Sequence, residues 1–550
     1  MKIHFCHPLP AMHVEGRNNG TYNNEELGFP GIMTTLDPRL DKFMHGLRNI
    51  IWDDRRLVFI DGKILMCSKN WIRDHVHEMK GFMHWEYNID SFLTFIIETQ
   101  REDGQFYELI KQLDDPHWTY VNEDCRILYP DDNLALVRLE LEADIEYLVV
   151  EGVLYNYRVT GDLAWVKSVL PALERGINYM TSDPKRWEPS LGLVKRPFTI
   201  DTWDFTYDPT IKTRSAHDRR ISPDTPMSVM HGDNTGVYAA MQMLAFFRRK
   251  LGDELAAVAW ETRAGVLKEN IFRHLYNGTF FIHQLHLGHA GADDKENERL
   301  SLSNTYALNR GIFTTDQARR VVEEYQRRRK TTRAFAEWFS IDPPYPDFIG
   351  YPAGEYVNGA ISPFAAGELA RGAFACGYED YAWDILSRFM RMMERDGKIY
   401  FLYSPEDGAP QDTMGPSAWG AASLLCAVDE GLAGIRDLDW GYRDLGFSPR
   451  FPVTPYTELR YVTGYEKTGT MVNVRYILTE EGLRYDVTSP ATVIHAHILL
   501  PKGKRPAAVN VNDRPAAYTP VTVGDSLYVD FDLTLPAPGT AAMEVLFAEG

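Results

Sequence analysis

The sequence predicts a mainly α-helical toroid followed by a smaller β-sandwich. Two observations carry this prediction: a helix–glycine–acid–helix pattern recurs through the middle of the chain, and short alternating β-type runs fill its C-terminal part. At 550 residues the chain is long enough for one large core and a second domain.

The repeated unit is a pair of helices joined at a glycine. It occurs around Gly161, Gly252 and Gly377, with a weaker copy at Gly311. Each glycine can take the left-handed conformation that ends a helix, and the acidic residue after it can cap the next helix. A series of such hairpins suits either a solenoid or a closed toroid. Their long, uneven spacing favours a toroid whose loops build a site.

The two ends of the chain differ from this helical middle. After a lead-in over residues 1–35, a short helix is expected near residues 40–51, and the run RLVFIDGKILMCS predicts a hairpin that turns at Asp61-Gly62. Runs such as MVNVRYIL, VIHAHILL and SLYVDFDLTL near the C-terminus predict a β-sandwich. We therefore expect a helical domain over residues 36–440 and a sandwich over residues 450–550.

Composition excludes several classes of protein. The net charge of −19 argues against a nucleic-acid surface, because phosphates would be repelled. No apolar stretch is long enough to span a membrane, and the N-terminal residues lack the apolar core of a signal peptide. The five scattered cysteines form no CxxC pair and suit reduced core thiols. These features predict a cytoplasmic protein.

The most informative chemical motif is Trp203-Asp204-Phe205, on a loop between two helical hairpins. Aromatic neighbours exclude water and raise the pKa of a carboxyl group, which keeps it protonated near neutral pH. Asp204 is therefore a candidate proton donor to a sugar. Asp201 lies three residues earlier in the same cluster, and the alternative interpretation is a solvated acidic loop.

A second cluster holds Trp71, Arg73 and Asp74, where a loop becomes a helix. An arginine beside a carboxylate can fix sugar hydroxyls through directional hydrogen bonds, although a helix cap with a surface ion pair is the alternative. A metal site at His75 and His77 lacks a third ligand. No cofactor is expected.

Three further clusters precede predicted helices. His231, Asp233 and Asn234 either bind a sugar or cap the helix that follows. Glu355 and Asn358 lie in an irregular Gly/Pro loop. The loop over residues 404–419 holds Glu406, Asp407 and Asp412 and ends at Trp419, although acids in such a loop are usually just exposed.

Taken in order, these clusters resemble the (α/α)6-barrel glycoside hydrolases of the clan that includes trehalases and processing α-glucosidase I. The stretch from Trp71 to Asp74 is similar to the clan's early Arg-Asp site. The clan's mid-chain Gly-Trp-Asp-Phe loop carries the general acid and maps onto Asp204, with Thr202 in place of the usual glycine. The later "NG" loop resembles residues 355–359, and residues 415–420 resemble the segment that follows the general base.

The resemblance implies a glycoside hydrolase with an (α/α)6 toroid and an inverting mechanism, in which an acid and a base act from opposite sides of the bond. Asp204 fits the acid. The final loop lacks a clear copy of the family's Glu-Tyr signature, so Glu406 is the preferred base, with Asp412 and Glu355 as alternatives. The expected substrate-binding residues are Trp71, Arg73, Asp74, Asp201, Trp203, His231, Asp233, Asn234, Glu355, Asn358 and Trp419.

Other classes stay open from the sequence. A glycoside phosphorylase would need phosphate ligands, and the loop over residues 404–419 has no Arg, Lys or His. A polysaccharide lyase acting on acidic sugars fits the negative charge poorly. A non-catalytic carbohydrate-binding toroid would keep the tryptophans yet tolerate loss of Asp204. The expected partner is a carbohydrate in each case, and the oligomeric state is not indicated.

Overall fold

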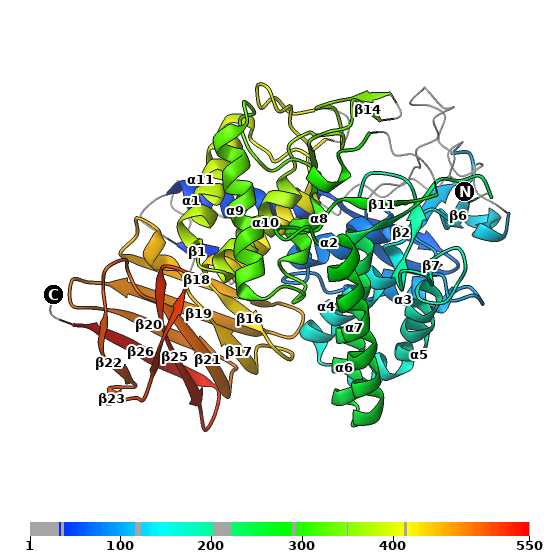
Figure 1. Ribbon diagram of the computed structural model, residues 1–550. Helices are drawn as coiled ribbons and strands as arrows, with labels where there is room; N and C mark the ends of the chain where they lie inside the picture. The colour runs from blue at the N-terminus through cyan, green and yellow to red at the C-terminus, as the bar shows by residue number, and fades with distance from the viewer. Residues whose placement is uncertain are drawn as a thin grey trace.

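The structure is a computed structural model of the chain. It describes residues 32–34, 38–115, 123–201, 221, 223–288, 293–348, 350–411 and 415–548. These ranges form a ring of helices with a β-sandwich packed beside it (Figure 1).

The described part of the chain contains twelve α-helices in two concentric layers. The inner helices are α2 (Ile72–Phe82), α4 (Ile145–Thr160), α6 (His231–Lys250), α8 (Ser303–Ala307), α10 (Pro363–Ala375) and α12 (Ala418–Cys426). Each inner helix contacts the next, and α12 contacts α2, which closes the ring. The outer helices are α1 (Pro38–Asp53), α3 (Ser91–Glu98), α5 (Leu163–Met180), α7 (Glu254–Leu275), α9 (Thr315–Thr331) and α11 (Glu379–Asp396). The predicted (α/α)6 toroid is confirmed.

Burial separates the two layers of the toroid. Every residue of α12 is buried, and in α2 only Asp74 is not, because inner helices are covered on all sides. The outer helices α9 and α11 bury one face and expose charged residues on the other, as amphipathic surface helices do.

The glycine turns form as the sequence predicted, but only some of the caps do. Gly161 ends α4 with φ +65°, and the Asp162 carboxylate accepts a hydrogen bond of 2.9 Å from the Trp165 N–H at the start of α5. Asp253 caps α7 in the same way, at 3.1 Å from the Ala256 N–H. At α9 the cap is instead Thr314, through a capping box.

Short antiparallel strands fill the connections of the toroid. The predicted N-terminal hairpin is confirmed as β2 (Arg55–Ile60) and β3 (Lys63–Ser68). The other strands in this part are β4 (Leu109–Gln112), β5 (Arg126–Tyr129), β6 (Leu134–Val137), β7 (Trp187–Glu188), β8 (Leu193–Val194), β9 (Arg196–Pro197), β10 (Met227–Met230), β11 (Gln284–Leu287), β12 (Leu300–Ser301), β13 (Ile341–Asp342), β14 (Asp347–Phe348) and β15 (Tyr351–Pro352). No parallel strand pair occurs among the described residues of the toroid.

The sandwich consists of two sheets, which confirms the C-terminal fold. One has the order β1-β18-β19-β20-β26-β22-β23 and the other β16-β17-β21-β25-β24. The strands are β1 (Ile32–Thr34), β16 (Ile435–Asp437), β17 (Asp444–Phe447), β18 (Glu458–Tyr465), β19 (Thr470–Leu478), β20 (Gly482–Ser489), β21 (Val493–Leu499), β22 (Pro506–Val511), β23 (Arg514–Pro515), β24 (Thr519–Val523), β25 (Ser526–Thr534) and β26 (Gly539–Phe547). One sheet thus includes β1, which precedes the toroid in the chain. After the toroid, the first sandwich strand is β16, which lies before residue 450.

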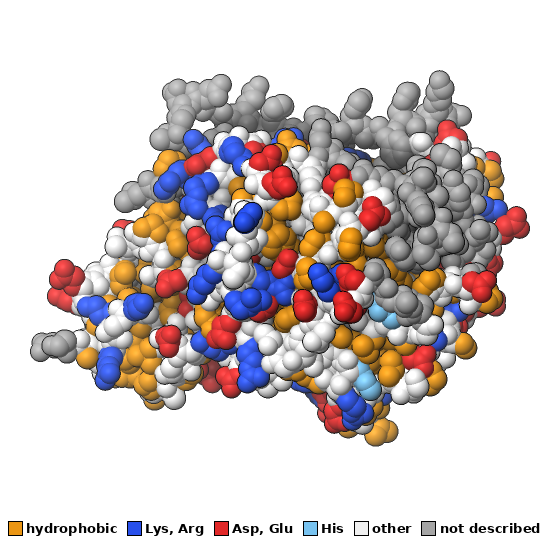
Figure 2. Space-filling model, turned by 45° about the horizontal axis from the view of Figure 1, so that its top comes forward, with side chains coloured by type: hydrophobic (Ala, Val, Ile, Leu, Met, Phe, Trp, Pro, Cys, Tyr) orange, Lys and Arg blue, Asp and Glu red, His pale blue; other side chains and the backbone are white. Residues whose placement is uncertain are grey.

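Toroid and sandwich share one hydrophobic core. Polar contacts cross the boundary as well: the Tyr461 hydroxyl donates to the Asp429 carboxylate at 3.0 Å, and the Ser526 hydroxyl donates to Glu379 at 2.7 Å. In the view of Figure 2, basic and acidic side chains are interspersed over both parts. Among the described helices, none is long and apolar enough to cross a membrane.

Candidate active site

The N-terminal ends of the inner helices point to one end of the toroid, which we call the front end. It carries the short strand β14, at the top of Figure 1. Helix N-termini carry partial positive charge, so carboxylates are favoured there. Asp144 precedes α4 directly, and Asp233 lies in the first turn of α6.

A buried cluster of acids and arginines joins three of these helix starts. The Arg73 guanidinium donates to both oxygens of Asp144, with Nε–Oδ2 at 2.6 Å and Nη2–Oδ1 at 2.9 Å, and also to Glu142. Arg196 lies 3.4 Å from both Glu142 Oε2 and Asp233 Oδ1. All five side chains are buried, so Arg73 is part of an internal network and not of a surface ion pair.

The two aspartates of this cluster differ in protonation. Burial raises the pKa of Asp144, but the Arg73 ion pair and hydrogen bonds outweigh it, so the net shift is downward. Burial raises the pKa of Asp233 to about 6, because the more distant Arg196 opposes it only in part. Within the described structure, Asp233 Oδ2 is buried and has no hydrogen-bond partner. Asp144 therefore stays ionised, whereas Asp233 can hold a proton near neutral pH.

His231 lies beside Asp233 at the first position of α6. Its Nδ1 atom is 2.9 Å from the Ile282 carbonyl oxygen, to which it donates, and burial lowers its pKa, so the ring is neutral. Its Nε2 atom is a buried acceptor with no partner among the described residues. The helix begins at His231 with Met230 before it, so neither Asp233 nor Asn234 is its cap.

The Asn234 side chain is fully used inside the protein. Its Oδ1 accepts from the Val194 N–H at 2.8 Å, and its Nδ2 donates to the carbonyl oxygens of Val194 and Met230 at 2.9 and 2.7 Å. This amide therefore holds β8 against the start of α6.

Asp201 is buried next to the same helix start. Its Oδ2 accepts from the Ser301 hydroxyl at 2.5 Å, and its N–H donates to His283 Nε2 at 3.3 Å. A Cβ added at Gly232 would lie 2.8 Å from Asp201 Oδ1, so glycine is needed for this close approach. The structure thus brings Asp201, His231 and Asp233 together, although 30 residues separate the first two in the chain.

A second network extends from His283 to Asn358. The Tyr345 hydroxyl donates to Glu296 at 2.6 Å, and His283 Nδ1 lies 3.0 Å from the same hydroxyl oxygen. Asn358 binds the backbone of Tyr345 on both sides, at 2.8 Å to its N–H and 2.9 Å to its carbonyl. Burial raises the pKa of Glu296, but hydrogen bonds from His283, His286 and Tyr345 lower it well below its usual value. Asn358 therefore positions Tyr345.

The predicted tryptophans occupy different environments. Trp419 is buried, donates from Nε1 to the Tyr306 hydroxyl at 2.8 Å, and stacks on His77 with ring centroids 4.2 Å apart. Trp71 is half-buried, with the Lys111 ammonium 5.6 Å from its ring. Burial raises the pKa of the neighbouring Asp74.

Glu355 and Glu406 are both exposed, on loops that lie side by side ahead of α10 and α12. The Gln411 side chain joins the two loops: it donates to the Gly354 carbonyl at 2.8 Å and accepts from the Tyr356 N–H at 2.9 Å. Trp203, Asp204 and Asp412 lie outside the described residues.

The sequence interpretation missed several members of these networks, namely Glu142, Asp144, Arg196, His283, Glu296 and Tyr345. For the first two a signal exists, because charged residues alternate with apolar ones from Arg138 to Asp144. The others carry no local signal. Among the described His, Cys, Asp and Glu residues, no group could hold a metal ion.

The fold defines the chain as an (α/α)6 toroid with an appended β-sandwich, and its front end gathers buried ionisable side chains from several helix starts. Solved structures with this fold include an α-L-rhamnosidase from Dictyoglumus thermophilum, with a TM-score of 0.58, 12% identity, and coverage of 94% of this chain and 50% of that one. The α-L-rhamnosidase of Streptomyces avermitilis, in complex with L-rhamnose, has a TM-score of 0.54, 14% identity, and coverage of 93% and 42%. The GH78 family rhamnosidase of Bacillus sp. GL1 has a TM-score of 0.52, 13% identity, and coverage of 82% and 40%.

The chain thus shares its fold with (α/α)6 glycoside hydrolases, as the sequence motifs predicted. It spans half the length of these three proteins or less. No family model matches the sequence, and no curated protein matches it.

Proposed function

We propose that the protein is a glycoside hydrolase whose substrate binds at the front end of the toroid. The observation that carries the proposal is the pair of buried, unpartnered polar atoms at the start of α6, Asp233 Oδ2 and His231 Nε2, as found among the described residues. Buried polar atoms are nearly always paired, so two such atoms on adjacent side chains suit a ligand with hydroxyl groups. The shared fold with α-L-rhamnosidases supports this choice of reaction class.

The proposed substrate is an oligosaccharide or simple glycoside. Sugar hydroxyls both donate and accept hydrogen bonds, which matches an acceptor nitrogen beside a carboxyl group that can be protonated. Since two of the solved proteins that share this fold are α-L-rhamnosidases, α-L-rhamnosides belong first in any panel.

The proposed mechanism is inverting. A carboxylic acid protonates the glycosidic oxygen, while a carboxylate takes a proton from the water that attacks the anomeric carbon from the opposite face. Asp204, the third residue after Asp201, is the proposed acid, and Glu406 is the proposed base, with Asp412 and Glu355 as alternatives. Asp233 is a second candidate for the acid, because its raised pKa of about 6 keeps part of the population protonated.

The first test is turnover of a panel of aryl glycosides and natural oligosaccharides, with the anomer of the first product identified by NMR. Hydrolysis that yields the opposite anomer supports both the reaction and its stereochemistry. Hydrolysis with retention would contradict the inverting mechanism alone. If no glycoside is turned over while a sugar still binds, the protein is a carbohydrate-binding toroid and the hydrolase proposal fails.

The second test identifies the acid. Asp204→Asn and Asp233→Asn are compared on a natural glycoside and on a dinitrophenyl glycoside, whose leaving group needs no protonation. Loss of the true acid should lower turnover of the natural substrate about a hundredfold to ten-thousandfold and spare the activated one. A variant that lowers both rates equally has lost a different role.

The third test identifies the base. Azide should restore activity to Glu406→Ala, because a small anion can occupy the space of the lost carboxylate and its water. Glu355→Ala is the matched control, since it removes an exposed glutamate from the adjacent loop. If azide instead rescued the Glu355 variant, Glu355 would be the general base.

A further inference from the structure

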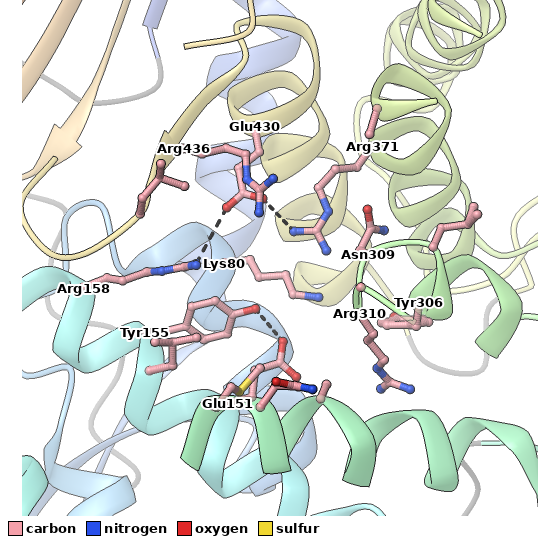
Figure 3. Close-up of a pocket in the computed structure, with 18 of the residues that line it drawn as sticks. Lys80, Glu151, Tyr155, Arg158, Tyr306, Asn309, Arg310, Arg371, Glu430 and Arg436 are labelled. Atoms are coloured by element: carbon pink, nitrogen blue, oxygen red, sulfur yellow. Dashed lines mark hydrogen bonds and ion pairs between the residues drawn. The ribbon is translucent and has the colours of Figure 1, made fainter. Parts of the chain in front are cut away.

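A cavity lies at the end of the toroid opposite the helix starts that form the front end, and Figure 3 shows residues that line it. This rear cavity has a volume of about 500 Å³ and lies between the C-terminal halves of the inner helices and strand β16 of the sandwich. It opens to solvent beside Arg436 and Leu438, which are both exposed. Tyr306, Lys80 and Trp419 separate it from the front end: the Tyr306 hydroxyl binds Trp419, and the Lys80 ammonium lies 5.2 Å from the Tyr306 ring.

The charge of the rear cavity is opposite in sign to that of the whole chain. The chain carries a net charge of −19, whereas the cavity lining holds more basic than acidic side chains. The basic residues are Lys80, Arg158, Arg310, Arg371, Arg436 and Arg450. The acidic residues are Glu151, Glu368, Glu430 and Asp439.

Some of these basic groups already have structural roles. Arg310 donates to the Gly232 carbonyl at 2.8 Å, and Arg450 donates to the carbonyls of Gly431 and Ser448 at 2.9 and 2.8 Å. Such bonds are expected where helix carbonyls need donors. Lys80 donates to Glu368 at 2.5 Å.

The remaining three arginines surround one carboxylate. Arg371 donates to Glu430 at 3.0 Å, and Arg158 lies 3.9 Å from the same carboxylate (Figure 3). The Arg436 side chain points toward this group as well, yet this side chain forms no hydrogen bond or ion pair with any described residue. Glu430 therefore serves several guanidinium groups and cannot neutralise them all.

The other acidic residues of the cavity do not neutralise the excess positive charge of these three arginines. Asp439 binds Lys250 at 2.7 Å, and Glu368 is shared by Lys80 and Arg371. Glu151 accepts from the Tyr155 hydroxyl at 2.6 Å on the opposite wall. Glu430 raises the pKa of Arg436, but desolvation and the guanidinium groups of three other arginines lower it by more, which is consistent with an uncompensated cation cluster.

We propose that the rear cavity binds a small oxyanion with two or more negative charges, such as phosphate or a phosphate ester, through Arg158, Arg371 and Arg436. Guanidinium groups suit this chemistry because their fixed fork of donors matches two oxyanion oxygens at once. The cavity volume of about 500 Å³ has room for the phosphate ester of a small sugar. The proposal does not depend on the reaction at the front end.

Calorimetric titration with inorganic phosphate, at low ionic strength in chloride buffer, tests this proposal. The wild-type protein should bind, and Arg436→Gln should weaken binding about tenfold or more, because a charge-assisted contact is lost. The Arg436 side chain forms no hydrogen bond or ion pair with a described residue, so its replacement should leave folding intact. Arg505→Gln is the matched control, since it removes an exposed arginine from the sandwich and should bind like wild type.

A parallel titration with glucose 6-phosphate separates the two forms of the ligand. Tighter binding of the ester than of free phosphate, lost in the same variants, assigns the cavity to phosphate esters, and the reverse order assigns it to free phosphate.

Arg158→Gln provides a second variant should Arg436→Gln fail to fold. Crystals soaked in tungstate should show an anomalous peak within the rear cavity. Equal affinity of wild type and both variants, absence of binding by either probe, or a peak only at the front end would overturn the proposal.

Discussion

Single buried side chains at the front end differ in charge because their neighbours differ. Asp144 has a bidentate arginine and a lowered pKa, whereas Asp233 has a longer contact, an unpartnered oxygen in the described structure, and a pKa of about 6. A pair of carboxyl groups whose environments separate their pKa values is the pattern that acid–base sites use. The immediate neighbours of each carboxyl group therefore determine whether it can exchange a proton near neutral pH.

Arg73→Lys tests how much the bidentate contact of the Arg73 guanidinium with Asp144 contributes to the stability of the protein. Lysine keeps the charge but cannot donate to both oxygens of Asp144, so the variant should lose about 2–3 kcal/mol of unfolding free energy. Arg475→Lys is the control: Arg475 pairs with Glu458 at 2.8 Å, but the pair is half-exposed and should contribute less than about 0.5 kcal/mol. Denaturant unfolding of both variants measures the difference, and equal losses would contradict a supporting role for Arg73.

Asp429 makes stability depend on pH. It is buried beneath the sandwich, and burial raises its pKa to about 7, from about 3.9 in an unfolded chain. The folded state thus binds the proton more tightly, so stability is full below pH of about 4 and falls as pH rises toward 7. His84, whose Nε2 lies 3.7 Å from Asp429, acts in the opposite direction, because burial lowers its pKa and its contribution to stability therefore rises with pH.

Asp429→Asn should remove the contribution of Asp429 to the pH dependence, since asparagine stays neutral and can still accept from Tyr461. The gain over wild type should grow between pH of about 4 and 7, to at most about 4 kcal/mol. Melting temperatures across this pH range provide the measurement, with Asp525→Asn as an exposed control. A constant difference between variant and wild type at all pH values would refute the assignment.

At the scale of elements, the glycine turns differ in what surrounds them. Gly161 and Gly252 both have positive φ, at +65° and +81°. A Cβ at Gly161 would overlap the indole of Trp440, on the loop between β16 and β17 of the sandwich, whereas a Cβ at Gly252 would meet nothing within 4 Å. The turn at Gly252 is therefore constrained by its backbone conformation alone, whereas the turn at Gly161 is also constrained by packing against Trp440.

Gly252→Ala should cost about 1 kcal/mol, from the left-handed conformation alone. Gly161→Ala should cost about 3 kcal/mol, because the added methyl group must also displace Trp440. In a double-mutant cycle, Trp440→Ala should recover part of the second loss, which denaturant unfolding can measure. Additive losses in the cycle would show that the collision does not determine the cost.

At the scale of the whole molecule, toroid and sandwich should unfold together. They share one core, and β1 ties the start of the described chain to β18 of the sandwich. The Glu379 carboxylate in α11 accepts from the hydroxyls of Ser526 and Tyr528 across the boundary.

Calorimetry should therefore show one unfolding transition for the wild-type protein. Glu379→Ala should lower its temperature without splitting it, because the apolar contacts across the boundary remain. The nearby Asp380→Ala, which leaves those contacts in place, is the control. Two separated transitions in the wild type would show that the two parts are independent.

The amino-acid sequence by itself determined the elements and their class. Helix periodicity, glycine turns and alternating strands are local signals, so the toroid and the sandwich followed from them, and the motifs at Trp71–Asp74 and His231–Asn234 were correctly expected where helices begin. Asp162 and Asp253 cap helices as expected for the same reason.

Only the tertiary structure decided which of these residues meet. Three hydrogen-bonded pairs join residues that are far apart in the chain: Arg73 with Asp144, 71 positions apart, Asp201 with Ser301, 100 apart, and Lys80 with Glu368, 288 apart. Asn358 resembles a sugar ligand in sequence, yet its amide binds the backbone of Tyr345. Such contacts depend on the order in which helices pack around the ring, and local periodicity carries no information about that order. The rear cavity arises in the same way, because its arginines come from inner helices and from the sandwich strand that closes the ring behind them.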